Sequence, residues 1–259
     1  MIRSMNGVED SVAILPPRVK ADLARCVGSS DTMRTLPPAC YTDSEVFEAE
    51  MQVIFRSGWI GVGRSDRWPE VGDYSAMELG GVPVVVVRGD DGGLHAFANS
   101  CSHRSAQVML GEGNCTRMRC RFHFWTYGLD GRLLAAPSMG RTDGFDKGEH
   151  ALAEFALAEV AGFVFVSFET DPPPIDAWLG DFLAVHEAWP VDSMVTARRR
   201  EFTVDCNWKA FAEVFNEYYH LPYVHPTSID HTYDEPDDAE VVQGSFATHF
   251  GTTDGTGGL

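Results

Sequence analysis

The sequence predicts an α+β protein in which a mostly antiparallel β domain is followed by the start of a second, helix-rich domain. At 259 residues the chain exceeds the usual length of one domain. Between residues 59 and 168, short runs of β-branched and aromatic residues alternate with glycine turns, a pattern typical of antiparallel strands. Three consecutive prolines at 172–174 then interrupt both helix and strand. We therefore expect a lead segment at 1–44, a β domain at 45–169 and the N-terminal part of another domain at 170–259.

Two strands in the β domain are the clearest. The run from Val82 to Arg88 holds five valines, and the run from Ala161 to Phe168 alternates valine with phenylalanine. Such residues favour the pleated, half-buried surface of a sheet. Glycine-rich turns at 89–93, 129–131 and 140–144 separate the strands of this region.

Helices are expected on both sides of the β domain. A short one is predicted around 19–26, and a longer one at 44–57, where Thr42 to Glu45 supply N-cap candidates and an acidic first turn. Beyond the prolines, apolar spacing predicts a helix at 175–189. A strand ending at Val204 follows, and then a helix that begins near Trp208 and ends soon after His220.

Charge and hydropathy limit the partners and the location of the protein. The chain has 20 Lys and Arg against 38 Asp and Glu, a net charge of −18, which argues against nonspecific binding to nucleic acid or anionic membranes. No apolar run approaches the roughly 20 residues that span a bilayer. The first fifteen residues lack the pattern of a secretory signal, so we expect a cytoplasmic protein. Its six cysteines do not form a secreted disulfide framework.

Two short Cys/His pairs, Cys101 with His103 and Cys120 with His123, carry the strongest chemical signal. Two thiolates and two imidazoles are the ligand set of a Rieske [2Fe–2S] cluster, in which the cysteines hold one iron and the histidines the other. Each pair fits the tip of a tight loop. A Cys2His2 zinc site is the alternative, although zinc fingers usually pair Cys with Cys and His with His. The four remaining cysteines are interpreted as structural.

A second metal site is predicted from Glu217, His220 and His225. On the helix, Glu213, Glu217 and His220 are spaced to share one polar face, opposite an apolar face with Trp208. We expect Pro222 to end the helix, so that His225 folds back beside His220. Two histidines with one carboxylate from elsewhere form the facial triad that holds Fe(II). The alternative is a polar helix face with two ordinary histidines.

The motifs resemble those of the ring-hydroxylating family of Rieske non-heme iron oxygenases, in its alpha, or terminal oxygenase, subunit. The resemblance covers about residues 42 to 226 and is most specific at residues 101–104, 120–133 and 207–225, with Ser105 where the family often has glycine. It implies a helix-on-antiparallel-sheet (helix-grip, START-like) catalytic domain, apparently truncated here. It also implies a [2Fe–2S] cluster, a mononuclear Fe(II) site and a homotrimer. A reductase or ferredoxin would supply electrons originating from NAD(P)H.

In such an oxygenase, Glu217 would hydrogen-bond His220 and connect it with His123 of a neighbouring subunit. Most characterised members have Asp at this position, and Glu occurs in branches that resemble those acting on quaternary-ammonium and N-methyl compounds. The resemblance implies mono- or dihydroxylation, or oxidative N-demethylation, of a small organic substrate with O₂. The alternative function is a non-catalytic Rieske electron carrier in which the two later histidines hold no iron.

The family's third iron ligand is an acidic residue well beyond the second histidine. This chain has thirty-four residues after His225, and we expect the acidic cluster at 230–240 to be a solvated loop. The glycine-rich end at 251–259 is typical of a loop within a domain. The sequence therefore favours a fragment whose third ligand lies beyond Leu259.

Overall fold

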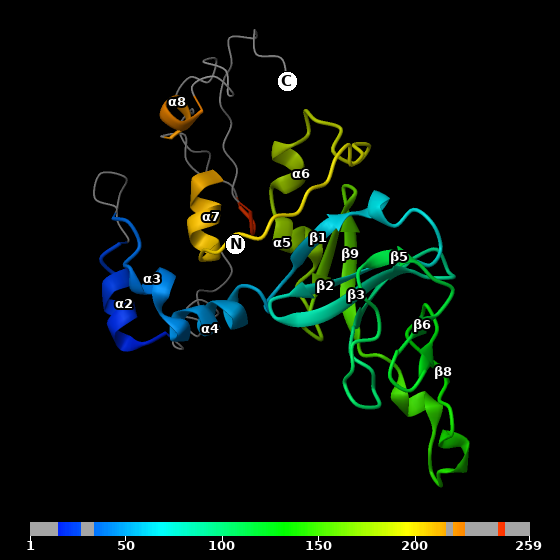
Figure 1. Cartoon of the computed structure of the whole chain (residues 1–259). Coiled ribbons are helices and arrows are strands. Elements are labelled where there is room, and N and C mark those ends of the chain that lie inside the picture. The colour runs from blue at the N-terminus through cyan, green and yellow to red at the C-terminus, as the bar shows by residue number, and fades with distance from the viewer. Residues whose placement is uncertain (1–14, 27–33, 216–219, 226–242, 247–259) are drawn as a thin grey trace. The chain divides into compact units, whose positions relative to one another are not determined.

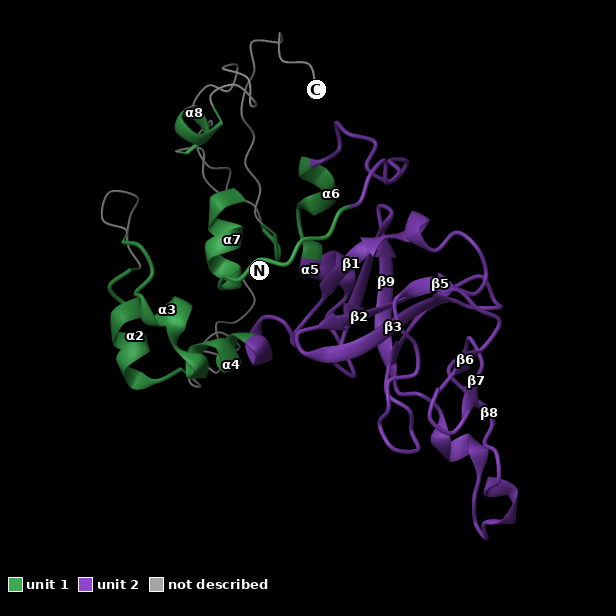
Figure 2. Cartoon of the chain, in the orientation of Figure 1, with its two compact units in different colours: residues 1–50, 179–185, 200–259 green, residues 51–178, 186–199 purple. Residues whose placement is uncertain are grey.

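The structure is a computed structural model that describes residues 15–26, 34–215, 220–225 and 243–246. The chain divides into two compact units (Figure 2). Unit 1 comprises residues 1–50, 179–185 and 200–259, and unit 2 comprises residues 51–178 and 186–199. Among the described residues, no helix has the length and apolar character needed to cross a bilayer.

Unit 2 is built on a seven-stranded sheet in which all the paired strands are antiparallel (Figure 1). In spatial order its strands are β1 (Ile60–Arg64), β10 (Phe163–Ser167), β9 (Glu154–Val160), β4 (Leu94–Ala98), β3 (Val82–Arg88), β2 (Asp73–Leu79) and β5 (Glu112–Asn114). The two strands expected from the sequence are therefore confirmed as β3 and β10, and a turn at 161–162 precedes β10.

The valine run of β3 is continuous because both faces of this strand are buried. Val84 and Val86 pack with Trp68, Val164 and Val166 in one apolar cluster. Val85 and Val87, on the other face, pack in a second cluster that contains Cys101 and Cys120. All four valines are fully buried. The strand thus joins the core of the sheet to the two loops that carry the Cys/His pairs.

A smaller sheet lies next to those loops. It consists of β6 (Met118–Arg119), β7 (Thr126–Tyr127) and β8 (Leu133–Ala135), joined antiparallel in that order. Unit 2 also contains three short 3-10 helices, η1 (Ser65–Arg67), η2 (Met139–Arg141) and η3 (Lys147–His150). Because β6 and β7 flank the second Cys/His loop, the small sheet fixes both ends of that loop.

Unit 1 is helical where the structure describes it. Its helices are α2 (Pro17–Leu23), α3 (Ala39–Thr42), α6 (Phe182–Val185), α7 (Trp208–Phe215) and α8 (Leu221–Val224). Helix α4 (Ser44–Val53) begins in unit 1 and ends in unit 2, and α5 (Ile175–Leu179) lies almost wholly in unit 2. Val19, Cys40 and Val46 form a small buried cluster among the first helices.

Several predicted elements differ from the observed ones. The helix expected at 44–57 ends at Val53, and the one expected at 175–189 is two short helices. Gly180 separates them with φ of +56°, where an added Cβ would lie 2.2 Å from the carbonyl oxygen of Gln243. The strand expected to end at Val204 is absent from the described segment 196–205. Pro222 lies in the first turn of α8 instead of ending a helix, a position that proline tolerates well.

Candidate functional site

The two Cys/His loops share one backbone geometry. In the first, the amide of Ser105 donates to the carbonyl of Cys101 (2.8 Å), and the amide of Cys101 donates to the carbonyl of Ala106 (2.8 Å). In the second, the amide of Phe124 donates to the carbonyl of Cys120 (3.1 Å), and the amide of Cys120 donates to Trp125 (2.9 Å). Each cysteine therefore opens a closed turn, and each histidine lies within that turn.

Both turns are closed by a non-glycine residue in the left-handed region. Ser105 has φ of 56° and Phe124 has φ of 58°. A side chain in this region costs about 1 kcal/mol or more relative to glycine. Glycine, which the family often has at position 105, adopts this conformation without that cost. The backbone at Ser105 is therefore locally strained.

The loops place the four predicted ligands in two matched pairs. Cys101 and Cys120 are buried, 3% and 1% exposed, and both are free thiols. The imidazole rings of His103 and His123 lie nearer the surface, with centroids 4.7 Å apart and planes at 76°. The indole of Trp125 stacks on His103 with centroids 4.9 Å apart. The structure therefore separates a buried pair of cysteines from an outer pair of imidazoles.

This arrangement fits a [2Fe–2S] cluster better than a zinc ion. The two cysteines are buried, and the two imidazoles face each other nearer the surface. A Rieske cluster requires only two protein ligands on each iron, one thiolate pair and one imidazole pair. A structural zinc site requires four donors around one centre.

A hydrogen-bonded group behind the cysteines involves Tyr127, which is fully buried. Its hydroxyl oxygen lies 3.1 Å from Sγ of Cys101 and 3.0 Å from Oγ of Ser102, and it accepts from the amide of Ser102. The Ser102 hydroxyl donates its proton to the carbonyl of His150 (2.7 Å). The phenol is therefore a possible donor both to Ser102 Oγ and to Cys101 Sγ, and it is the donor to Cys101 when that cysteine is a thiolate. Burial, and next the hydrogen bond to Cys101, raises the pKa of Tyr127 above its usual value, so the hydroxyl stays protonated.

Sequence reasoning included Tyr127 only as part of a motif and missed its contact with the thiol. It also missed Asn99, which is fully buried and shapes the chain after the first loop. The Asn99 side chain accepts from the amides of Val108 and Met109 and donates to the carbonyl of Met109. The sequence signal that could have pointed to Asn99 is a polar residue two positions before Cys101.

The second predicted site is only partly within the described residues. His220 and His225 stand at the two ends of α8, as its N-cap and C-cap residues, with ring centroids 5.5 Å apart. The structure thus brings the two predicted imidazoles together. Glu217 and the acidic cluster at 230–240 lie outside the described residues. Two neighbouring imidazoles suit a non-heme iron site, which needs a carboxylate as its third protein ligand.

Helix α7, which precedes these histidines, is held by a buried ion pair. Nζ of Lys209 lies 2.7 Å from each carboxylate oxygen of Glu50, and the two side chains are only 9% and 12% exposed. The indole of Trp208 donates to the same carboxylate (2.9 Å). Asn207 donates to the carbonyl of Tyr41 and accepts from the amide of Lys209. Three consecutive residues thus fasten the start of α7 to the N-terminal segment.

The apolar side predicted for this helix is largely exposed. Phe211 and Phe215 are 51% and 66% exposed, whereas Lys209 is buried. Neutralisation by Glu50 makes that burial tolerable. On the polar side, the Tyr41 hydroxyl donates to Glu213 (2.7 Å), which raises the pKa of Tyr41 to about 12. The predicted polar position at Glu213 therefore contacts the N-terminal segment.

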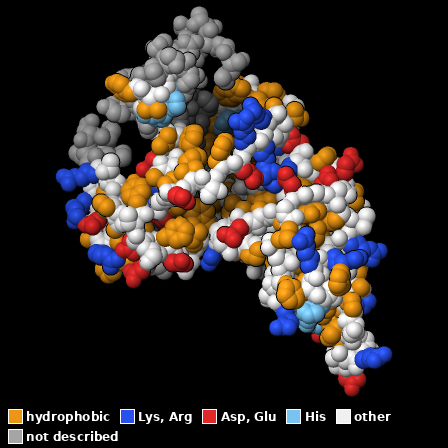
Figure 3. Space-filling model, viewed as in Figure 1, with side chains coloured by type: hydrophobic (Ala, Val, Ile, Leu, Met, Phe, Trp, Pro, Cys, Tyr) orange, Lys and Arg blue, Asp and Glu red, His pale blue; other side chains and the backbone are white. Residues whose placement is uncertain are grey.

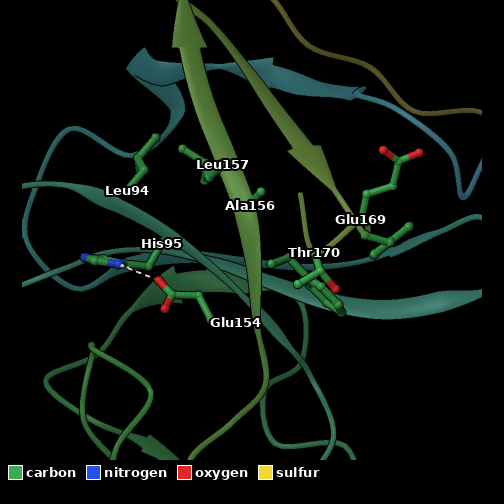
Figure 4. A pocket seen from close by; sticks show the side chains of 9 residues that line it. Leu94, His95, Glu154, Ala156, Leu157, Glu169 and Thr170 are labelled. Atoms are coloured by element: carbon green, nitrogen blue, oxygen red, sulfur yellow. Dashed lines mark hydrogen bonds and ion pairs between the residues drawn. The ribbon is translucent and has the colours of Figure 1, made fainter. Parts of the chain in front are cut away.

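A shallow pocket of about 490 Å³ lies elsewhere in unit 2, and none of the predicted site residues lines it (Figure 4). His95 stands at its edge between Glu154 (3.4 Å) and Asp91 (3.1 Å). Burial alone would lower the pKa of His95, but its hydrogen bonds to the two carboxylates outweigh that effect and raise the pKa. The lining residues are Leu94, His95, Glu154, Phe155, Ala156, Leu157, Phe168, Glu169 and Thr170.

The fold and the paired loops define an iron–sulfur domain of the Rieske class. Residues 58–156 match the Rieske [2Fe-2S] domain, and residues 181–254 match the catalytic domain of the ring-hydroxylating alpha subunit. The chain therefore belongs to the Rieske non-heme iron oxygenases, as an alpha subunit, in agreement with the resemblance seen in its motifs. The cofactors of that family are a [2Fe–2S] cluster and a mononuclear non-heme iron.

Among characterised relatives, the glycine betaine monooxygenase oxygenase subunit of Chromohalobacter salexigens is 39% identical over 211 residues, which cover 79% of this chain and 46% of the relative. The chloroplastic choline monooxygenase of Arabidopsis thaliana is 35% identical, over 74% of this chain and 48% of the relative. The crystal structure of a quaternary ammonium Rieske monooxygenase with L-carnitine superposes with a TM-score of 0.71 at 30% identity, over 77% of this chain and 58% of that one. The chain spans about half the length of the curated relatives it matches.

Proposed function

We propose that the chain forms the cluster-bearing part and the start of the catalytic domain of a terminal oxygenase component. In this proposal Cys101, His103, Cys120 and His123 hold a [2Fe–2S] cluster, and His220 and His225 hold a mononuclear Fe(II). When bound, the cluster stores and transfers single electrons, and the iron binds O₂ beside the substrate. The observation that carries the proposal is the presence of two imidazole pairs, one of them beside a buried thiolate pair, in a chain that matches both family domains.

The residues of this chain position the proposed metal ligands and shield the cysteines from water. The closed turns hold the four cluster ligands, and burial of both cysteines keeps water from the thiolates. Glu217 is proposed to orient His220 through its free ring nitrogen and to connect it with His123 of a neighbouring subunit. The third iron ligand is proposed to be a carboxylate. A head-to-tail homotrimer, a reductase or ferredoxin donor and a cytoplasmic location remain predictions of the family resemblance and the sequence.

The proposed substrate class is a quaternary-ammonium or N-methyl compound, oxidised by hydroxylation or oxidative N-demethylation. Two observations support it. Glu217 stands where most family members have Asp, and similar relatives are named for glycine betaine, choline and carnitine. Naphthalene dioxygenases also share the fold, at 29% identity and a TM-score of 0.67, so an aromatic substrate is the competing class.

Metal analysis tests the function directly. We expect three irons and two acid-labile sulfides per chain in the anaerobically purified holoprotein that contains these residues. Two irons and two sulfides would support an electron carrier, and one zinc without sulfide would overturn both readings. Replacing His220 with Ala should remove one iron and abolish substrate-dependent O₂ uptake while the EPR signal of the reduced cluster remains. His186→Ala, outside both ligand sets, is the matched control and should keep three irons.

The substrate class needs a separate assay. With NADH, a reductase and O₂, we expect product from glycine betaine, choline or carnitine and none from naphthalene. Product from naphthalene alone would contradict the substrate proposal and leave the oxygenase assignment in place.

A further inference from the structure

The two histidines of the proposed cluster are not equally covered by the chain. His103 is partly buried, and the indole of Trp125 stacks on its ring with an interplanar angle of 14°. His123 is exposed, although its ring lies beside that of His103. In Figure 3, a histidine lies at the surface beside hydrophobic and basic side chains, at the end of unit 2 that carries the small sheet. The two imidazoles therefore meet the solvent to different extents.

Two further rings pack against the indole of Trp125, which is itself only 3% exposed. The rings of Phe145 and His150 meet it in T-shaped geometry, with centroids 5.7 Å and 5.5 Å from that of the indole. Phe145 and His150 also stack on each other, with centroids 4.9 Å apart and planes at 15°. Stacked and edge-to-face pairs favour one arrangement of the rings over others. We call Trp125, Phe145 and His150 the aromatic cover of His103.

The segment that carries the outer two rings is fastened to the cluster-bearing part of the chain. At the end of η3, the carbonyl of His150 accepts from the hydroxyl of Ser102 (2.7 Å), which lies between the two ligands of the first loop. At the start of η3, Nζ of Lys147 donates to the carbonyl of Leu134 (3.1 Å) in strand β8. Hydrogen bonds at both ends of η3 therefore hold the His150 ring in place beside the first loop.

The aromatic cover has a consequence for the redox chemistry of a bound cluster. Reduction adds one negative charge, and water stabilises that charge better than aromatic rings do. Rings that exclude water from one ligand imidazole therefore lower the reduction potential. Contacts of this kind also fix the orientation of the ligand ring on its iron. Because the cover lies against His103 and leaves His123 exposed, both effects act on one side of the cluster.

We propose that Phe145 and His150 are positioning residues that hold Trp125 against His103, and that this one-sided cover lowers the reduction potential of the cluster and makes its two histidine ligands unequal. The inference rests on the cluster of the proposed function and does not involve the mononuclear iron. It gives a role to two residues that lie outside both Cys/His motifs.

Removal and replacement of the His150 ring test the proposal. A redox titration of the holoprotein at fixed pH measures the potential, and pulsed EPR of the reduced cluster measures the nitrogen couplings of its two histidine ligands. We expect His150→Ala to raise the equilibrium constant for reduction at least threefold, a rise of about 28 mV for a one-electron couple. It should also change one of the two nitrogen couplings. His150→Phe keeps a stacking ring and should restore the potential and the coupling of the wild type.

Thr142→Ala is the control within the same segment. Thr142 is exposed and lies outside the aromatic cover, so its truncation should change neither the potential nor the couplings. If His150→Ala does not take up the cluster, Phe145→Ala replaces it in the comparison, because it removes the other outer ring that contacts the indole.

Three results would overturn the proposal: a potential of His150→Ala equal to that of the wild type, a fall in that potential, or a His150→Phe variant that behaves like His150→Ala. A fall would show that the imidazole acts through its charge, and the absence of rescue would show that its nitrogen atoms matter more than its ring. The proposed function fails separately. Two irons per chain would refute the mononuclear site without changing the potentials, and zinc without sulfide would overturn both ideas before any titration.

Discussion

The hydrogen bond between Tyr127 and Cys101 should raise the reduction potential of the bound cluster. Reduction adds one negative charge, so a donor to a ligand thiolate stabilises the reduced state more than the oxidised one. Tyr127→Phe removes the donor and keeps the ring that fills a fully buried site. A hydrogen bond to a charged group contributes about 1.5–3 kcal/mol in all. If about 1 kcal/mol of this differs between the two redox states, the one-electron potential should fall by about 40 mV.

A redox titration followed by the EPR signal of the reduced cluster measures this shift. Ser102→Ala is the matched control, because the Ser102 hydroxyl donates to His150 and only competes with Cys101 for the phenol proton. Its loss should leave the potential unchanged or raise it slightly. A Tyr127→Phe potential within about 10 mV of the wild-type value, or above it, would refute the assignment of the phenol proton to Cys101.

Three further predictions concern stability. Ser105→Gly should raise the melting temperature of the β domain by relieving the left-handed backbone at φ 56°, a gain of about 1 kcal/mol, and a calorimetric scan that shows no gain would contradict the strain. Glu50→Gln should lower the free energy of unfolding by about 3 kcal/mol because it leaves Lys209 buried without its counter-charge. The double variant with Lys209→Met should recover most of that loss in urea unfolding, and a purely additive double variant would refute the coupling. His95 has a raised pKa in the folded state, so its stabilisation is complete below the unfolded pKa of about 6.5 and is lost as pH rises through the folded pKa. The difference in melting temperature between wild type and His95→Gln should accordingly shrink from pH 5.5 to pH 9, and a pH-independent difference would exclude the ionic contribution.

The Cys/His loops were predictable because all their information is local. Residue spacing predicted both Cys/His pairs, which the structure places in matching turns, and the run of valines predicted β3, since these patterns are contained in short segments. The departure of Ser105 from the family's usual glycine was also visible. However, only the backbone angles show that each turn contains a residue in the left-handed region, Ser105 in one and Phe124 in the other.

The contacts of Tyr127 were not predictable because they depend on three separate segments. Its hydroxyl reaches residues 101 and 102, and the proton of Ser102 is directed to the carbonyl of residue 150. The spacing along the chain is 25 to 48 residues, and neither motif contains the third partner. The predicted effect of Tyr127 on the reduction potential follows only when the donors and acceptors of all three segments are considered together.

Helix α7 shows that an apolar pattern alone does not tell which side of a helix is buried. The apolar side includes Phe211 and Phe215, which the structure leaves exposed, and the pattern gave no reason to bury Lys209. The partner that makes this burial possible, Glu50, precedes Lys209 by 159 residues and lies in a helix that the sequence assigned to the β domain. Burying an ion pair costs the desolvation free energy of both charges. Their mutual attraction offsets this cost only when both partners are present and well placed. The pair therefore specifies which N-terminal helix meets α7, and loss of either charge should loosen the helix that leads toward His220.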